Sequence, residues 1–237
     1  MNKLLRTIAL AGVLLCATAW LNVATAQDLR YSWFEFGLLG QDVQKAGSQF
    51  DLDLNQAVDI KASDGSGVRF RGSIGTWRNF YVFANFESSD PNVEAVVTNT
   101  QGTFLASDKF DLTSLRGGIG YKYTLNHRMD LVAELGYDSI EFDFGSFAGE
   151  DFDVDGNDIG ASLGVRWMLN DDWEFHAHGR FTNVGDVNLT TKEFDSDVLA
   201  GVGLSYMPIR GFSLTLDYEG GQIETFSLGF RLDLDED

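Results

Sequence analysis

The sequence predicts an all-β protein, a closed antiparallel up-and-down transmembrane β-barrel of about ten strands. Two observations carry this fold class: long runs that alternate apolar and polar residues, and a recurring pattern of a small residue, a spacer, an aliphatic residue and a glycine. Strict alternation is typical of strands, because successive side chains of a strand point to opposite faces. The runs are about ten residues long or more, which matches the roughly nine to eleven residues of a tilted strand that crosses a membrane.

The recurring pattern indicates one hairpin unit used several times. Its copies end at Gly75, Gly120, Gly164, Gly203 and Gly229, and the last is looser because Phe226 replaces the small residue. Each copy lies within an alternating run. If the five copies lie on strands of one direction, five partner strands of the other direction are required, which gives ten.

Each strand can be placed from the alternation. The expected strands are 30–40, 66–76, 79–88, 110–124, 129–143, 157–169, 173–187, 195–207, 211–219 and 222–234. Short turns near 77–79, 125–128, 170–172 and 208–211 alternate with longer connections at 41–65, 89–109, 144–156 and 188–194. Residues 50–54 also alternate, so they either extend the first two strands or form part of an extra hairpin. Eight and twelve strands are therefore the alternative counts.

The first 26 residues have the form of a secretory signal peptide. Lys3 and Arg6 precede an apolar run from 8 to about 20, and Ala24 and Ala26 give a small-x-small cleavage site. The apolar run is shorter than the roughly 20 residues of a membrane-spanning helix. The expected domains are a signal peptide at 1–26 and a barrel domain at 27–237.

Cys16 is the only cysteine and lies within this leader. A lipoprotein anchor at Cys16 is the alternative interpretation, but bulky Leu15 stands where such signals carry a small residue. After cleavage the expected chain has 211 residues and no cysteine, so disulfides contribute nothing to its stability.

The charge of the expected mature chain is strongly negative. Loss of Lys3 and Arg6 leaves 15 basic residues against 36 acidic ones, a formal charge of −21. Nucleic-acid binding requires a basic surface, so this composition argues against a nucleic-acid partner.

The last strand resembles a known targeting sequence. Ser227, Gly229, Leu232 and Leu234 match in order the C-terminal signal by which the outer-membrane assembly machinery recognises its clients. Leu234 stands where an aromatic residue is commonest, and an acidic tail follows it. With the leader and the hairpins, the chain resembles the small porin-like outer-membrane β-barrel family of Gram-negative bacteria. The resemblance implies location in the cell outer membrane. It also implies contact with lipid and lipopolysaccharide, help from the assembly machinery and periplasmic chaperones, and a monomeric barrel.

Charged residues at inward positions separate by strand direction. The predicted lumen charge network comprises Glu35, Arg69, Arg71, Arg116, Lys122, Asp130, Glu134, Arg166, Glu174, Asp217 and Arg231, with further acids at Glu87, Asp138 and Glu219. Basic residues lie on strands of one direction and acidic residues on their neighbours, so opposite charges are expected to face each other. Turn symmetry predicts the pairs Arg166–Glu174 and Lys122–Asp130.

Three functions are compatible with such a lumen. Ion pairs can fill and seal a narrow barrel that has a structural or surface-interaction role, as in small barrels whose interiors hold only side chains. A narrow channel for small solutes or cations is the alternative. A barrel enzyme is the third, with His176 and His178 as candidate proton carriers, but no nucleophile motif accompanies them. We therefore expect no catalytic residues. A soluble barrel of the lipocalin type is the competing fold.

One acidic stretch begins like a calcium loop. Asp151, Asp153 and Asp155 have the spacing of the first three ligands, and Gly156 follows them. Ser162 occupies the twelfth position, where a bidentate Glu is required. An acidic, solvated loop is the expected structure, and neither a metal nor a cofactor is predicted.

Overall fold

The computed structural model describes residues 29–43, 47–51, 56–99, 102–147, 150–188 and 193–234. The expected signal peptide lies outside these residues. The described chain forms fourteen strands: β1 (Trp33–Val43), β2 (Gly47–Asp51), β3 (Gln56–Ala62), β4 (Gly65–Gly75), β5 (Phe80–Ser89), β6 (Asn92–Asn99), β7 (Gly102–Lys109), β8 (Asp111–Asn126), β9 (Met129–Phe147), β10 (Glu150–Met168), β11 (Trp173–Asn188), β12 (Glu193–Ile209), β13 (Phe212–Gly220) and β14 (Ile223–Asp233). Within these ranges, no helix is both long and apolar enough to span a membrane.

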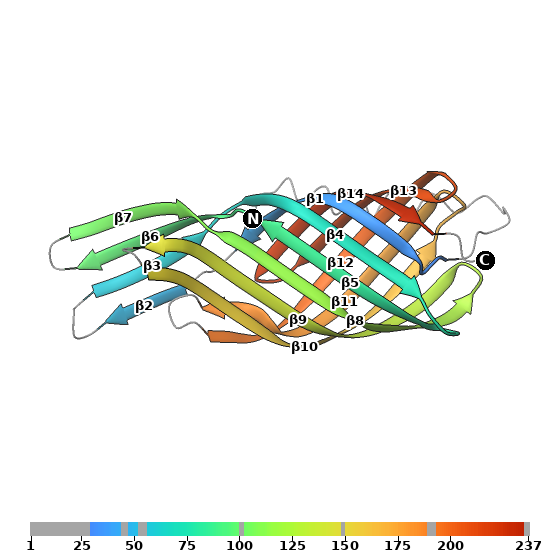
Figure 1. The fold of residues 1–237 in the computed structure, drawn as a ribbon, viewed down its shortest axis with the longest axis horizontal. Coiled ribbons are helices and arrows are strands. Elements are labelled where there is room, and N and C mark those ends of the chain that lie inside the picture. Colours follow the sequence, from blue (N-terminus) through green and yellow to red (C-terminus); the bar gives the residue numbers. More distant parts are fainter. Residues whose placement is uncertain are drawn as a thin grey trace.

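Ten of the strands close into an antiparallel barrel, in the order β1-β14-β13-β12-β11-β10-β9-β8-β5-β4. Figure 1 shows these strands crossing the barrel wall at a steep tilt. The first and last strands close it, since β1 pairs with β14 over its full length from Trp33↔Asp233 to Val43↔Ile223. The predicted fold class and strand count are confirmed.

The four remaining strands form a second sheet in the order β2-β3-β6-β7. This sheet projects beyond one end of the barrel, at the left of Figure 1. Its strands lie within 41–65 and 89–109, two of the ranges in which the sequence predicts long connections. Each range folds into a hairpin, and β3 pairs with β6 to join the two hairpins. Joining is favourable because an isolated two-stranded hairpin is only marginally stable.

Polar contacts anchor this sheet where β6 and β7 meet the barrel. Lys109 Nζ donates a hydrogen bond to Asp90 at 3.1 Å, and this bond lowers the pKa of the Asp90 carboxyl. The Ser63 amide donates to the Asn92 carbonyl at 2.9 Å, which ties the end of β3 to the start of β6.

β9 and β10 are much longer than predicted, because the expected connection at 144–156 is mostly strand. Beyond the membrane-spanning part of these strands, the inward-facing residues become apolar and the outward-facing residues become polar. Phe142 points inward and is fully buried, whereas Glu141 and Asp143 are exposed. The strands therefore continue as a wall with an apolar interior and a polar exterior, which is stable in water.

We call the two ends of the barrel the turn end and the loop end. The turn end carries the connections 76–79, 127–128, 169–172 and 210–211, and the loop end carries the four-stranded sheet. Asparagine side chains form the turns: Asn126 Oδ1 accepts from the Arg128 amide at 2.8 Å, and Asn170 Oδ1 accepts from two amides at 2.9 Å. Such bonds replace the ladder bonds that end at each turn.

Candidate functional site

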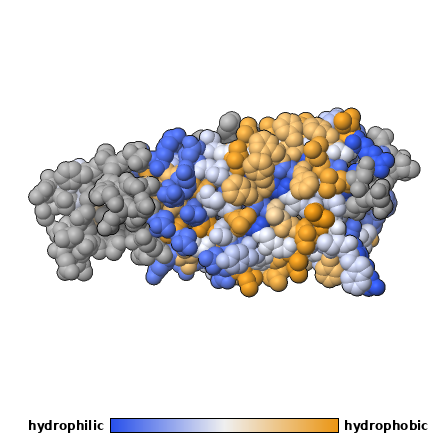
Figure 2. Space-filling view, in the orientation of Figure 1, coloured by the Kyte–Doolittle hydropathy of each residue, from blue (hydrophilic) through white to orange (hydrophobic). Residues whose placement is uncertain are grey.

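The outside of the barrel wall is apolar. Leu163 is 71% exposed and Leu228 is 54% exposed, although both lie in the middle of long strands. On the face of the barrel seen in Figure 2, the apolar residues form a band across the wall, with hydrophilic residues toward both ends. At the turn end the band finishes in aromatic pairs, such as Trp173 and Tyr206 with ring centroids 4.8 Å apart. A soluble barrel buries its apolar face inward, so this exterior is that of a transmembrane barrel.

The lumen contains a network of arginines, carboxylates and histidines. Its centre is Asp217 on β13, which lies 2.7 Å from Arg71 Nη2 and 2.7 Å from His176 Nε2. Arg71 on β4 also contacts Glu35 on β1. β1 and β14 lie between β4 and β13 in the barrel. These contacts therefore connect strands that are not neighbours as well as strands that are.

Glu174 is a second centre of the network and is 1% exposed. Arg166 Nε donates to one of its oxygens at 2.7 Å, and Arg231 Nη2 donates to the other at 2.9 Å. Removing one partner of such a buried pair is costly, because it leaves an uncompensated charge in a medium of low dielectric constant. Arg231 also pairs with Asp233 at 2.9 Å, at the end of the last strand.

A third part of the network lies nearer the loop end. Arg116 contacts Glu134 at 3.1 Å and Asp138 at 3.2 Å. His178 Nε2 lies 2.7 Å from Glu219, which Arg180 also contacts. Arg69 pairs with Glu87 at 2.7 Å.

The residues of the predicted lumen charge network therefore lie together in the lumen. Of the two ion pairs predicted from turn symmetry, one is present and one is wrong. The Arg166–Glu174 pair is present, although it is diagonal because Arg166 lies directly opposite His176. Lys122 does not pair with Asp130. The hairpin turns at 127–128 instead of around Asn126, so Lys122 lies opposite Val132, and its ammonium sits 4.4 Å from the centre of the Tyr31 ring.

A glycine in the recurring pattern makes room for this network. Gly203 lies opposite His176, and a Cβ built on it would lie 2.3 Å from both the imidazole and a carboxylate oxygen of Asp217. Any larger residue there would have to displace the His176–Asp217 pair. The recurring glycine thus has a packing role on the inner face.

The turn end of the lumen is closed by the segment that precedes β1. Leu29, Tyr31 and Ser32 are all buried, and Leu29 and Tyr31 pack against a cluster that contains Tyr81, Met168 and Met207. The alternation predicts a strand over 30–40 and does not indicate this role. A tyrosine and a leucine just before a strand that faces a lumen were the available signal.

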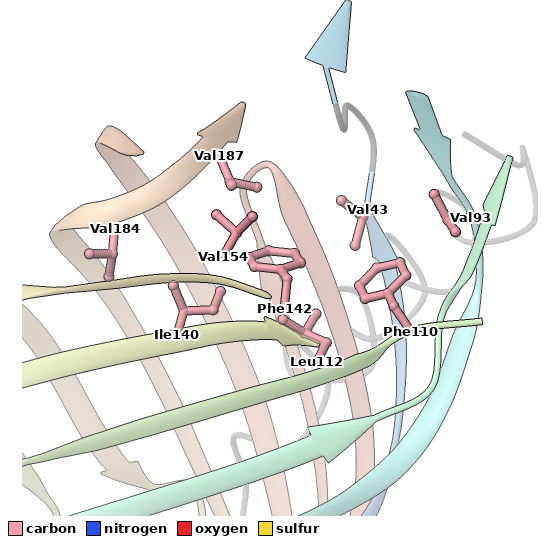
Figure 3. Close-up of a cluster of buried hydrophobic side chains, with 9 residues drawn as sticks. All are labelled: Val43, Val93, Phe110, Leu112, Ile140, Phe142, Val154, Val184 and Val187. Atoms are coloured by element: carbon pink, nitrogen blue, oxygen red, sulfur yellow. The ribbon is translucent and has the colours of Figure 1, made fainter. Parts of the chain in front are cut away.

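The loop end of the lumen is closed by a cluster of aliphatic and aromatic side chains. Figure 3 shows them converging inside the mouth of the barrel, and their members are Val43, Val93, Phe110, Leu112, Ile140, Phe142, Val154, Val184 and Val187. Val93 comes from β6, so the four-stranded sheet contributes to this closure. The ring centroids of Phe110 and Phe142 lie 5.7 Å apart.

Between the two clusters lies a polar chamber of about 180 Å³. Arginines, carboxylates and both lumen histidines line it, and Tyr31 and Tyr81 line its turn end. Ser205 also lines it and is 1% exposed, and among the described residues its hydroxyl has no hydrogen-bond partner. The chamber is polar enough to hold ordered water.

The acidic stretch is not a loop. Asp151, Asp153 and Asp155 lie within β10, where Asp153 is opposite Asp143 and Asp155 is opposite Glu141. The extended backbone does not wrap around an ion as a calcium loop does. Within the described part of the chain, no group of three or more potential metal-ligating His, Cys, Asp or Glu residues occurs.

The residues of the predicted assembly signal lie on or next to β14. Ser227 and Gly229 face the lumen, and the Ser227 hydroxyl accepts a hydrogen bond from Arg69 Nη1 at 2.6 Å. Leu232 and Leu234 are 55% and 37% exposed. The acidic tail that follows them lies outside the described residues.

No family model and no curated protein matches this sequence. Solved structures that match include the β domain of the Bordetella autotransporter Brka, which is 11% identical with a TM-score of 0.46 and covers 87% of this chain and 100% of its own. The translocator domain of autotransporter NalP from Neisseria meningitidis is 12% identical with a TM-score of 0.44, and the match covers 97% of this chain and 96% of that one. Ail of Yersinia pestis is 11% identical with a TM-score of 0.41, with coverage of 88% and 100%. These values are too low to transfer an activity.

Proposed function

We propose that this chain is an integral outer-membrane β-barrel whose lumen is sealed, and which acts through what it presents outside the membrane. The observation that carries the proposal is that side chains obstruct the lumen at three successive levels. The segment before β1 closes the turn end, the ion-pair network narrows the middle to a small chamber, and the apolar cluster closes the loop end.

Electrostatics supports the sealed state. The carboxylate of Glu174 is held by Arg166 and Arg231, and the carboxylate of Asp217 is held by Arg71 and Arg69. An ion that crossed the lumen would have to displace these partners inside a wall of low dielectric constant, which is costly. It would then have to pass the cluster around Phe142, whose aliphatic and aromatic side chains carry no charge.

The outer-membrane location rests on three features of different origin. They are the apolar band of the wall, the signal-peptide form of residues 1–26 and the order of Ser227, Gly229, Leu232 and Leu234. In this location the turn end faces the periplasm and the loop end faces outward, as is usual for barrels with short periplasmic turns. The partners would be lipid and lipopolysaccharide around the band, with the assembly machinery and periplasmic chaperones during insertion of a monomeric barrel.

The role at the cell surface would belong to the four-stranded sheet and the extended ends of β9 and β10. The extended ends of β9 and β10 have polar exteriors beyond the apolar band, as at Glu141, Asp143 and Asp155. A catalytic role is not proposed, because the Nε2 atoms of His176 and His178 are each bound to a carboxylate within the network.

A liposome-swelling assay tests the sealed lumen against a channel for small solutes. Purified barrel is incorporated into liposomes, which are diluted into isotonic solutions of small sugars or amino acids. We expect swelling no faster than in protein-free liposomes. Swelling that increases with the amount of barrel would support the channel and overturn the sealed lumen.

Location is tested by membrane fractionation together with heat-modifiable migration on a gel. A transmembrane barrel remains compact in detergent until heated, so unheated and heated samples should migrate differently. Recovery in the soluble fraction without detergent would contradict the proposal.

A further inference from the structure

The mouth of the lumen at the turn end has the character of a binding site for an extended peptide. Tyr81, Met168 and Met207 supply apolar walls, and Lys122 and Asp130 supply charges of opposite sign. In the structure this site is occupied by Leu29–Ser32, which is not part of any strand.

Tyr31 makes the most specific contacts. Its hydroxyl donates a hydrogen bond to Asp130 at 2.9 Å. Two cations lie over its ring, with Lys122 Nζ at 4.4 Å and the Arg166 guanidinium carbon at 4.5 Å from the ring centre. Two cations over one ring favour an aromatic residue at position 31. The Asp130 carboxylate, which accepts the hydroxyl hydrogen bond, favours tyrosine over phenylalanine.

Backbone contacts fix the rest of the segment. Arg166 Nη1 donates to the Arg30 carbonyl at 2.8 Å. The Ser32 hydroxyl accepts from the Gly75 amide at 3.0 Å, and the Ser32 carbonyl accepts from the Leu234 amide at 2.8 Å. The Ser32–Leu234 bond continues the β1–β14 pairing along the wall, and the Arg166 bond holds the Arg30 carbonyl at the mouth.

We propose that the turn-end mouth is a peptide-binding site occupied in cis by Leu29–Ser32, and that its occupancy controls access to the polar chamber. Tyr31 is the gate, because it is the residue of this segment that lines both the mouth and the chamber. Residues 29–31 belong to no strand, so contacts with side chains of the lumen, and not a continuous backbone ladder, hold them at the mouth. The segment can therefore open while the barrel stays folded.

The absence of cysteine from 27–237 allows a direct test of access. Ser205 lines the chamber and is buried, so Ser205→Cys introduces a nearly isosteric thiol as a reporter. The reporter chain begins at residue 27, is folded in detergent, and is treated with a small charged methanethiosulfonate reagent. The rate of modification measures how often the chamber opens.

Tyr31→Ala in the reporter chain removes the gate. We expect modification to be faster by more than about ten-fold, because a hydrogen bond to a charged group and two cation–π contacts are lost. Tyr123→Ala is the matched control, since Tyr123 lies near the same end but faces outward and is 58% exposed. We expect the control to react at the rate of the parent reporter. Equal rates for the two variants would overturn the gate.

Two further arms keep the test decisive. Lys122→Met removes one cation and keeps the length of the side chain, and we expect a rise of about two- to five-fold even if Tyr31→Ala fails to fold. A synthetic peptide of residues 27–34, added to the folded Tyr31→Ala chain, should slow the reaction toward the parent rate. No slowing at millimolar peptide would contradict the peptide-binding site.

This inference rests on the proposed sealed lumen, and the two can fail separately. Solute uptake by the unmodified barrel would overturn the sealed lumen. An impermeable barrel whose reporter reacts equally fast with and without Tyr31 would overturn only the gate.

Discussion

Arg231 on the last strand of the barrel donates a hydrogen bond to Glu174 on β11 at 2.9 Å. The two residues are separated along the wall by β12 and β13, so the bond crosses the lumen. Arg166 holds the other oxygen of the same carboxylate. One buried carboxylate thus joins three parts of the barrel.

Glu174→Gln should destabilise the folded barrel strongly. The substitution keeps the shape but leaves Arg166 and Arg231 without their shared counter-charge, which costs about 3–5 kcal/mol for a buried pair. Guanidinium unfolding in lipid vesicles measures the change in free energy. Glu141→Gln is the control, because Glu141 is exposed beyond the apolar band, and its effect should stay within about 0.5 kcal/mol. Similar effects for both variants would contradict a structural role for the network.

Gly203→Ala should disrupt the charge network, because Gly203 lies on the barrel wall next to His176 and Asp217. The added methyl would collide with His176 and Asp217, so we expect a loss of about 1–3 kcal/mol from overpacking. Gly179→Ala is a matched control on the neighbouring strand, where a Cβ meets nothing within 4 Å. The two proteins can be compared by the temperature at which the compact gel form is lost. A lower temperature for Gly179→Ala than for Gly203→Ala would refute this packing argument.

Much of the fold could be predicted from the sequence, because membrane-spanning strands repeat one simple pattern. The alternation around Ile119 and Leu163 gave both the strands and the inward residues correctly. The pattern is informative there since lipid on one side and a polar lumen on the other impose opposite demands on neighbouring residues.

The same rule failed where the environment changes. Beyond the band, water replaces lipid and the interior becomes apolar, so Phe142 and Val154 point inward and the expected connection is strand. Pair register was also hard to predict, because the hairpin turns at 127–128 instead of around Asn126, and Lys122 then lies opposite Val132 and not Asp130. Closure of the turn end by Tyr31 depends on contacts with residues distant in sequence, such as Asp130 and Met207, and no local pattern encodes them.

Phe142→Ala should open a cavity in the loop-end cluster. Phe142 is fully buried against Phe110 and Leu112, and loss of such a ring costs about 3–5 kcal/mol. Phe36→Ala is the comparison, since Phe36 is 42% exposed on the outer face of β1. Unfolding in vesicles should show a clearly larger loss for the inner residue. Equal losses would argue that the cluster does not pack as a core.

Leu163→Arg tests the position of the apolar band. Leu163 is 71% exposed on the outer face of β10, and an arginine at the membrane midplane of a barrel costs about 2–4 kcal/mol. Ser196→Arg, at an exposed position of β12 beyond the band, should cost less than about 1 kcal/mol. Reversible folding into phospholipid vesicles gives both values. An arginine tolerated equally at both positions would place Leu163 outside the membrane.

Planar-bilayer recording of the purified barrel tests the sealed lumen most directly. The three-level closure predicts a bilayer current that stays at the protein-free baseline at moderate voltage, with no sustained single-channel steps. Reproducible, long-lived steps that prefer cations would show that ions pass the network around Glu174 and Asp217, and would contradict the sealed barrel.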